Sequence, residues 1–188
     1  SLNKSGVNAL VSPLQIGPGT ATVRWQQANQ IADSVVVGMF AGCTLDVNSY
    51  SDAIGSLAGF GTVNLGVGTL TTGGDNTSTT FSGNIGGVGF TPIIKTGAGT
   101  FTLSGNNTYT GGTIVGSGAS FLIPNGPAAV GGSVIASNGA TLGLSGGGAT
   151  PGTPATITTV DGATVSFTSG ALGKIWGGQF VSWPSGGE

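Results

Sequence analysis

The stretch "GAGTFTLSGNNTYTGGTIV", residues 97–115, decides the fold of this chain. Phe101 and Leu103 alternate with threonines, and a second apolar pair follows at Ile114 and Val115. Between the two pairs lies a run of Gly, Asn and Thr, which are poor helix formers and common in turns. Apolar residues at period two predict strands rather than helices. We therefore expect two short β-strands joined by a glycine-rich corner.

The pattern of this stretch recurs along the chain: a small residue, then Thr or Ser, then an apolar residue, any residue and a second apolar residue. The first apolar positions of seven copies are Leu45, Val63, Phe81, Phe101, Phe121, Leu142 and Val165, which are 18 to 23 residues apart. A second series, 18 to 22 residues apart, consists of Ile94, Val115, Ile135, Ile157 and Ile175. Each period therefore carries two short extended segments separated by turns.

A period near 20 residues with two or three strands is typical of a β-solenoid, in which coils stack at about 4.8 Å. The sequence predicts an all-β, parallel β-helix of about seven coils. The residues expected to point outward are Asp46, Asn64, Ser82, Thr102, Gly143 and Ser166. Neutral side chains suit such positions, because like charges stacked at strand spacing repel each other.

The ends differ from the middle. "GTATVRW" (19–25) predicts a strand, and "QQANQIAD" (26–33) is the one stretch that suits a short helix. "SGGGATPGTPAT" (145–156) is expected to be a loop. The predicted organisation is an N-terminal capping or docking segment at 1–33, a β-helix at 34–172 and an aromatic C-terminal segment at 173–188 that contains Trp176, Phe180 and Trp183.

Residues 97–115 closely resemble the autotransporter-associated β-strand repeat, also called the passenger-associated transport repeat. The residues that match its motif are Gly97, Gly99, Thr100, Leu103, Gly105, Asn107, Thr108, Tyr109, Thr110, Gly111 and Thr113. Phe101 departs mildly, because an aliphatic residue is commoner there. The resemblance implies a right-handed parallel β-helix that is exported and displayed outside a bacterium with an outer membrane. It brings no catalytic residues with it.

Composition excludes several function classes. Four basic and six acidic residues give no electrostatic case for nucleic acid or anionic lipid, and His, the usual general base and metal ligand, is absent.

The longest apolar stretch, 35–45, is too short to cross a bilayer, so no membrane insertion by this segment is expected. The one cysteine, Cys43, has no partner for an internal disulfide. Met39 is the only methionine, which suggests a processed or excised piece.

No catalytic, cofactor-binding or metal-binding residue is predicted, and no cofactor. A polysaccharide-cleaving β-helix would need convergent carboxylates, but the positions equivalent to Asp46 in later coils are not acidic. "TGGDN" (72–76) occurs once and does not repeat as a calcium-binding array would, so Asp75 is expected in a turn. Ice binding would need regular Thr columns, and the outward column is irregular.

The function predicted from the sequence is therefore a non-enzymatic, extracellular structural protein, a building block of a bacterial surface stalk, adhesin or fibre. The main alternative is a self-assembling filament subunit joined by terminal strand exchange. Ice binding and polysaccharide cleavage remain minor alternatives. The expected partners are copies of the chain, a continuation of the same chain, or host or matrix surfaces.

Overall fold

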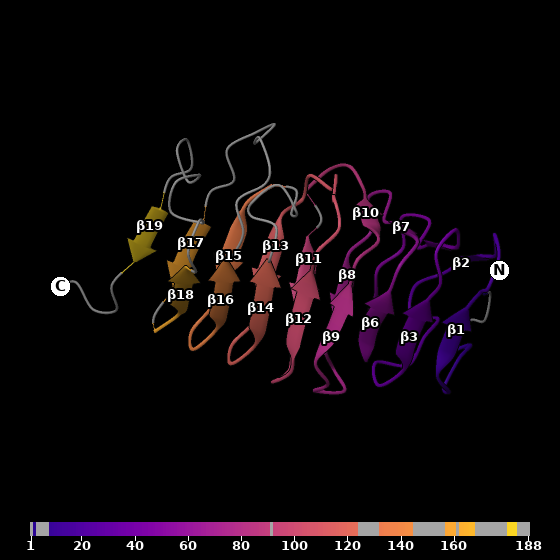
Figure 1. Cartoon of the computed structure of the whole chain (residues 1–188), viewed down its shortest axis with the longest axis horizontal. Helices are drawn as coiled ribbons and strands as arrows, with labels where there is room; N and C mark the ends of the chain where they lie inside the picture. Colours follow the sequence, from indigo (N-terminus) through magenta and orange to yellow (C-terminus); the bar gives the residue numbers. More distant parts are fainter. Residues whose placement is uncertain are drawn as a thin grey trace.

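The computed structural model describes Leu2 and residues 8–90, 92–123, 132–144, 157–160, 162–167 and 180–183. Within these ranges all regular elements are β-strands, and every strand pairing is parallel. The strands stack as a β-solenoid of about six turns, with β1 and β19 at opposite ends of the stack (Figure 1). The predicted all-β parallel β-helix is thus confirmed, and the expected seven coils are close.

The described strands form three sheets. The eight-stranded sheet consists of β1 (Leu14–Ile16), β3 (Val36–Met39), β6 (Ser56–Gly59), β9 (Thr79–Phe81), β12 (Thr100–Leu103), β14 (Ser120–Ile123), β16 (Thr141–Leu144) and β18 (Thr164–Phe167). The seven-stranded sheet consists of β5 (Asp52–Ile54), β8 (Leu70–Thr72), β11 (Ile93–Lys95), β13 (Thr113–Val115), β15 (Val134–Ala136), β17 (Ile157–Val160) and β19 (Phe180–Trp183). The four-stranded sheet consists of β2 (Thr22–Arg24), β4 (Thr44–Asp46), β7 (Thr62–Asn64) and β10 (Asn84–Gly86).

The core is a narrow column of apolar side chains between the three sheets. Each strand sends alternate residues inward, so the same position on successive coils stacks along the axis. Phe101 pairs with Phe121, which pairs with Leu142 on the next coil. The rings of Phe101 and Phe121 meet edge to face, with centroids 5.8 Å apart and planes at 65°. Such an aromatic pair stabilises the fold by about 1 kcal/mol beyond the contribution from burying the two rings.

The predicted first series mixes two sheets. Leu45 and Val63 pair with each other in the four-stranded sheet, whereas the copies from Phe101 onward lie in the eight-stranded sheet. Phe81 also lies in that sheet but opposes Leu103 rather than Phe101. The cause is geometric. A small residue followed by Thr and an apolar residue occurs wherever a strand follows a tight corner, whichever sheet that strand joins. The strands of all three sheets also have similar lengths, so the spacing does not distinguish them.

The predicted second series mixes inward and outward positions: Val115 and Ile157 are buried, whereas Ile94 and Ile135 lie one residue away from the inward column. Ile175 lies outside the described residues. Ile94 opposes Ile114 and then Ile135, which is 39% exposed. The inward column instead runs through Ile93, Thr113, Val134 and Ile157 (in that order along the stack). Because side chains alternate between faces, a shift of one residue exchanges the core set for the solvent set.

The N-terminal prediction was partly wrong. No helix occurs at 26–33. Ile31 there forms a parallel bridge with Leu10, and the Gln30 and Ile31 N–H groups donate to the Asp52 carboxylate of the next coil. Bonds between coils replace the bonds within a helix. The stacked sheets also begin at β1 and β2, before residue 34, so residues 14–33 already form a coil.

The C-terminal predictions are only partly covered by the structure. The backbone of β19 pairs with β17 and so extends the seven-stranded sheet. Trp176, the remainder of 173–188 and the predicted loop at 145–156 lie outside the described residues. The capping or docking roles of the two ends therefore remain predictions.

Candidate functional site

The stretch 97–115 forms β12, a corner and β13, and three of its polar side chains are buried in the core. Asn107 is 5% exposed, and Tyr109 and Thr113 are each 1% exposed. A buried polar group is costly unless it is hydrogen-bonded. The partners of these three side chains therefore show what the segment does.

Asn107 acts as part of the backbone ladder. The Ile85 N–H of β10 donates to Asn107 Oδ1 at 2.8 Å, and Asn107 Nδ2 donates to the Gly105 carbonyl at 3.2 Å. The Thr108 N–H then donates to the Ile85 carbonyl at 2.8 Å. The side chain thus satisfies a backbone donor of the preceding coil at a corner where the main chain turns away.

Tyr109 fills the core beside the corner. Its hydroxyl lies 2.6 Å from Thr113 Oγ1, and both groups are buried. Burial raises the pKa of Tyr109 far above its ordinary value, although the bond with Thr113 acts in the opposite direction. The phenol is therefore neutral, and its hydroxyl forms a buried hydrogen bond rather than acting as an acid or base.

The glycines of the stretch allow the close stacking of coils. A Cβ atom built on Gly99 would lie 2.1 Å from the Thr77 carbonyl oxygen, and one on Gly105 would lie 1.8 Å from that of Gly83. Gly97 has a φ of +67°, a conformation that side chains rarely adopt. Gly97, Gly99, Gly105 and Asn107 therefore all contact the preceding coil.

The segment that makes these contacts is a known repeat. Residues 93–119 match the model of the passenger-associated-transport-repeat family. The chain carries a passenger-associated transport repeat. The suspected resemblance is therefore confirmed over this segment, which we call the passenger repeat. A search of curated proteins and a search of solved structures each returned no match.

The passenger repeat and the solenoid together fit a passenger-domain β-helix, and the repeat indicates a secreted or surface location. The described residues include no helix long and apolar enough to cross a membrane. The passenger repeat spans a small part of the chain. The function of the remaining coils has to be argued from their own side chains.

The acidic side chains serve local structural contacts. Asp46 was expected to face water, but it is 7% exposed. Arg24 Nε lies 2.7 Å from Asp46 Oδ2, and the Asn48 N–H donates to Oδ1 at 2.9 Å. The carboxylate lies on the outer side of its strand, since Leu45 beside it is in the core, but Arg24 from the neighbouring coil covers it.

Asp52 is 5% exposed and fastens the first coil to the second. Its Oδ2 accepts the Gln30 and Ile31 N–H groups at 2.8 and 3.0 Å, and its Oδ1 accepts the Ala53 N–H at 2.9 Å. Burial raises the pKa of Asp52 and outweighs these hydrogen bonds, with a further contribution from the charge of Asp33. These three donors are backbone N–H groups, so the carboxylate has a structural role.

Asp75 lies in a turn, as predicted. Ser56 Oγ donates to Asp75 Oδ2 at 2.6 Å, and the Thr77 N–H and hydroxyl donate to Oδ1 at 2.9 and 2.8 Å. Partial burial acts to raise the pKa of Asp75, but the hydrogen bonds from Ser56 and Thr77 hold it below its ordinary value. Asp75 therefore stays ionised and binds both its own turn and Ser56 of β6.

Lys95 is a residue that sequence reasoning missed. It is 1% exposed, and its Nζ donates to the carbonyls of Thr96 and, at 3.0 Å, Gly97. Burial lowers the pKa of Lys95, and the charge of Asp75 partly opposes this. The amine satisfies carbonyl groups at a corner of the coil. The sequence signal was its place two residues after Ile93, since alternate residues of a strand point to the same face.

Within the described part of the chain, no three His, Cys, Asp or Glu residues gather where they could hold a metal ion. Asp46, Asp52 and Asp75 each bind a different partner, as given above, and form no shared acidic pair. Cys43 is buried, and its thiol lies 3.1 Å from the Gly19 carbonyl. The chemistry available at these positions is structural hydrogen bonding.

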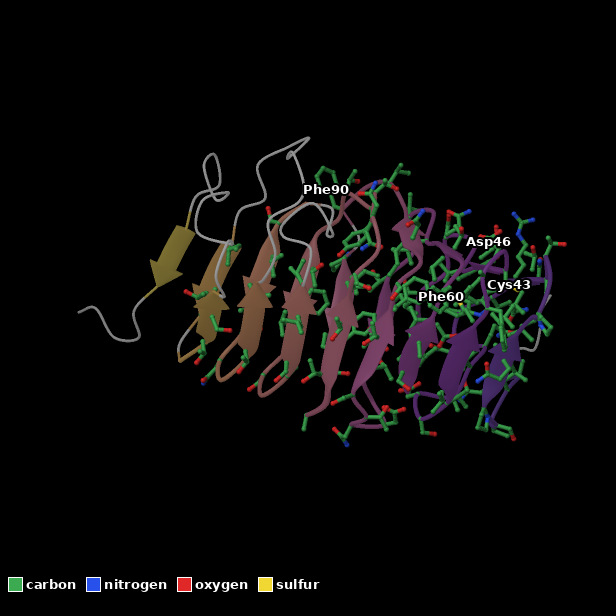
Figure 2. All side chains as sticks on the ribbon, viewed as in Figure 1. Cys43, Asp46, Phe60 and Phe90 are labelled. Atoms are coloured by element: carbon green, nitrogen blue, oxygen red, sulfur yellow. The ribbon has the colours of Figure 1, made fainter. Side chains whose placement is uncertain are left out.

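The exposed aromatic residues are the second feature that sequence analysis missed. Phe40, Phe60 and Phe90 are 49%, 56% and 100% exposed. All three lie at corners beside the four-stranded sheet, directly after β3 and β6 and four residues after β10. Figure 2 shows Phe60 close to Asp46 and Phe90 farther along the solenoid axis, toward the later coils. Their position outside the apolar alternation was the available signal, and Phe60 and Phe90 also adjoin glycines.

Proposed function

We propose that this chain is a non-enzymatic structural segment of a secreted or surface-displayed bacterial passenger, a building block of a stalk, adhesin or fibre. The observation that carries the proposal is that the buried polar side chains of the passenger repeat form hydrogen bonds within and between coils. Asn107 bonds the preceding coil, and Tyr109 bonds Thr113 in the core. Side chains used in this way hold a rod together.

The proposed setting is the outside of a bacterium with an outer membrane. It is supported by the match to the passenger repeat. The surface is nearly uncharged, with four basic and six acidic residues in the whole chain. This gives no reason to expect nucleic acid as a partner. The expected neighbours are further coils of the same chain or other copies.

The test removes single coils in register. Because Ile93 opposes both Leu70 and Thr113, deleting 93–112 or deleting 70–92 each takes out one coil and rejoins equivalent positions. The full chain and both deletions would be fused to a translocator domain and expressed in a Gram-negative cell. Surface display would be measured by antibody labelling and by protease access on intact cells.

We expect the full chain to be displayed, and the 93–112 deletion to lose display more severely than the matched 70–92 deletion. Equal display of both deletions would contradict a special role of the passenger repeat in export. Failure of the full chain to reach the surface would contradict the passenger assignment. Enzyme activity of the purified chain on polysaccharide would contradict the structural role.

The alternative is a self-assembling filament subunit. It is favoured by the edges of the stack: in the described residues, β18 and β19 pair on one side only, with β16 and β17. An open parallel edge can accept a strand from another copy. Electron microscopy of the purified chain separates the two functions, since uniform fibres support the filament and discrete short rods support the stalk segment.

A further inference from the structure

The outer face of the four-stranded sheet carries two columns of side chains along the solenoid axis. In one column Thr22, Thr44, Thr62 and Asn84 oppose one another on successive strands. In the other, Arg24, Asp46, Asn64 and Gly86 do so. We call this surface the polar face; its members are the eight residues just given. Its hydroxyl and amide groups repeat at the strand spacing of about 4.8 Å.

The polar face is electrically neutral. Its two charged residues, Arg24 and Asp46, form an ion pair of 2.7 Å and cancel each other. The two coils from Thr62 onward present hydroxyl and amide groups alone: Thr62, Asn64 and Asn84 are exposed. The next coil continues the pattern with exposed Asn106 and Thr108. Such groups donate and accept hydrogen bonds without selecting a charge.

Exposed aromatic rings flank the polar face on both sides. Phe40 and Phe60 stack one coil apart where the chain enters the sheet, because the Phe60 N–H donates to the carbonyl of Met39, the residue before Phe40. Where the chain leaves the sheet after β10, Val88 and Phe90 are 65% and 100% exposed. Figure 2 shows Phe60 and Phe90 on opposite margins of this side. Large apolar groups gathered at one surface indicate a binding role.

We propose that the polar face, with Phe40, Phe60 and Phe90 at its margins, binds a neutral polysaccharide that lies along the solenoid axis. Sugar rings offer hydroxyl groups to the Thr and Asn columns and apolar C–H faces to the phenylalanine rings, whose faces carry partial negative charge. The absence of net charge on the face disfavours acidic glycans, which need basic partners. A ligand with a repeating unit matches a surface that repeats at every coil.

This proposal goes beyond the structural role, because it gives the rod a ligand and requires no catalysis. The test is affinity electrophoresis of the purified chain in gels that contain hydroxyethyl cellulose, galactomannan or xyloglucan. Heparin and polygalacturonate, which are acidic, serve as charge controls. The variants are Phe60→Ser with Phe90→Ser, and Thr62→Val with Asn84→Leu. Ile135→Ser is the control, since Ile135 is an exposed apolar residue that lies on the seven-stranded sheet, away from the polar face.

We expect retardation by at least one neutral polysaccharide and not by the acidic ones. The double Phe variant should lose affinity about tenfold, which corresponds to about 1.4 kcal/mol, and the Thr62/Asn84 variant should lose affinity as well. Ile135→Ser should bind as the parent does. Circular dichroism confirms that each variant is folded.

No retardation by any of the three neutral polysaccharides, binding of heparin alone, or equal binding by the Phe variant would overturn the proposal. Self-association measured by sedimentation velocity that the Phe substitutions abolish would also overturn it, since the face would then bind a second copy. None of these results bears on surface display, so failure here is distinguishable from failure of the proposed structural function.

Discussion

The side-chain oxygen of Asn107 accepts the backbone N–H of Ile85 on the preceding coil at 2.8 Å. An amide side chain thus takes the place of a main-chain carbonyl in the parallel ladder. The corner of the passenger repeat can therefore turn without leaving a buried donor unpaired.

Asn107→Ala should destabilise the chain by about 1–3 kcal/mol, because the Ile85 N–H would be buried without an acceptor. Urea unfolding followed by circular dichroism measures this loss. Asn106→Ala is the control: it lies in the same corner but is exposed, and it should change the unfolding free energy by less than about 0.5 kcal/mol. Equal losses in both variants would refute the ladder role of Asn107.

Tyr109 and Thr113 should show energetic coupling. Removing either hydroxyl leaves the other buried without its partner, at a cost of about 1 kcal/mol or more. A double-mutant cycle with Tyr109→Phe, Thr113→Val and the combined variant measures the coupling in unfolding free energy. Strictly additive effects would show that the 2.6 Å contact contributes nothing.

Gly105→Ala should prevent normal stacking of the coils, since the new Cβ would lie 1.8 Å from the Gly83 carbonyl oxygen. Gly86→Ala is the matched control, because its Cβ would come no closer than 3.4 Å, to Thr108 Oγ1. We expect a large drop in the melting temperature for the first variant and a small change for the second. A stable Gly105→Ala chain would contradict the close approach of these coils.

Asp75 and Asp52 should give pH dependences of opposite sign. The folded pKa of Asp75 is lowered, so its stabilising contribution is present above its unfolded pKa and is lost as the pH falls through the folded value. The gap in stability between the parent and Asp75→Asn should therefore close in acid. Unfolding titrations across the acidic range measure it.

The folded pKa of Asp52 is raised by burial, so its contribution is greatest below its unfolded pKa and declines as the pH rises through the folded value. Asp52→Asn should consequently lose less stability, relative to the parent, at neutral pH than in acid. A constant offset at all pH values also applies, because the nitrogen of the introduced amide cannot accept the Ala53 N–H that Asp52 Oδ1 accepts in the parent. The same trend for Asp52 and Asp75 would contradict this account.

The sequence by itself determined the type of fold and the identity of the repeat. Alternation of apolar residues around Phe101 and Leu103, repeated at about 20 residues, required strands stacked in coils, because period two suits no helix. The motif from Gly97 to Thr113 identified the passenger repeat, since its glycines and polar residues meet geometric needs that few other residues satisfy.

Only the tertiary structure decided which strands share a sheet. Leu45 and Phe101 carry the same local pattern, yet one lies in the four-stranded sheet and the other in the eight-stranded sheet. Local spacing does not distinguish faces whose strands and corners have similar lengths. Burial of Asp46 and Lys95, and the alignment of Phe40 with Phe60, likewise depend on contacts between coils about 20 residues apart. The pattern of residues within one coil does not show which residues of the next coil lie opposite them.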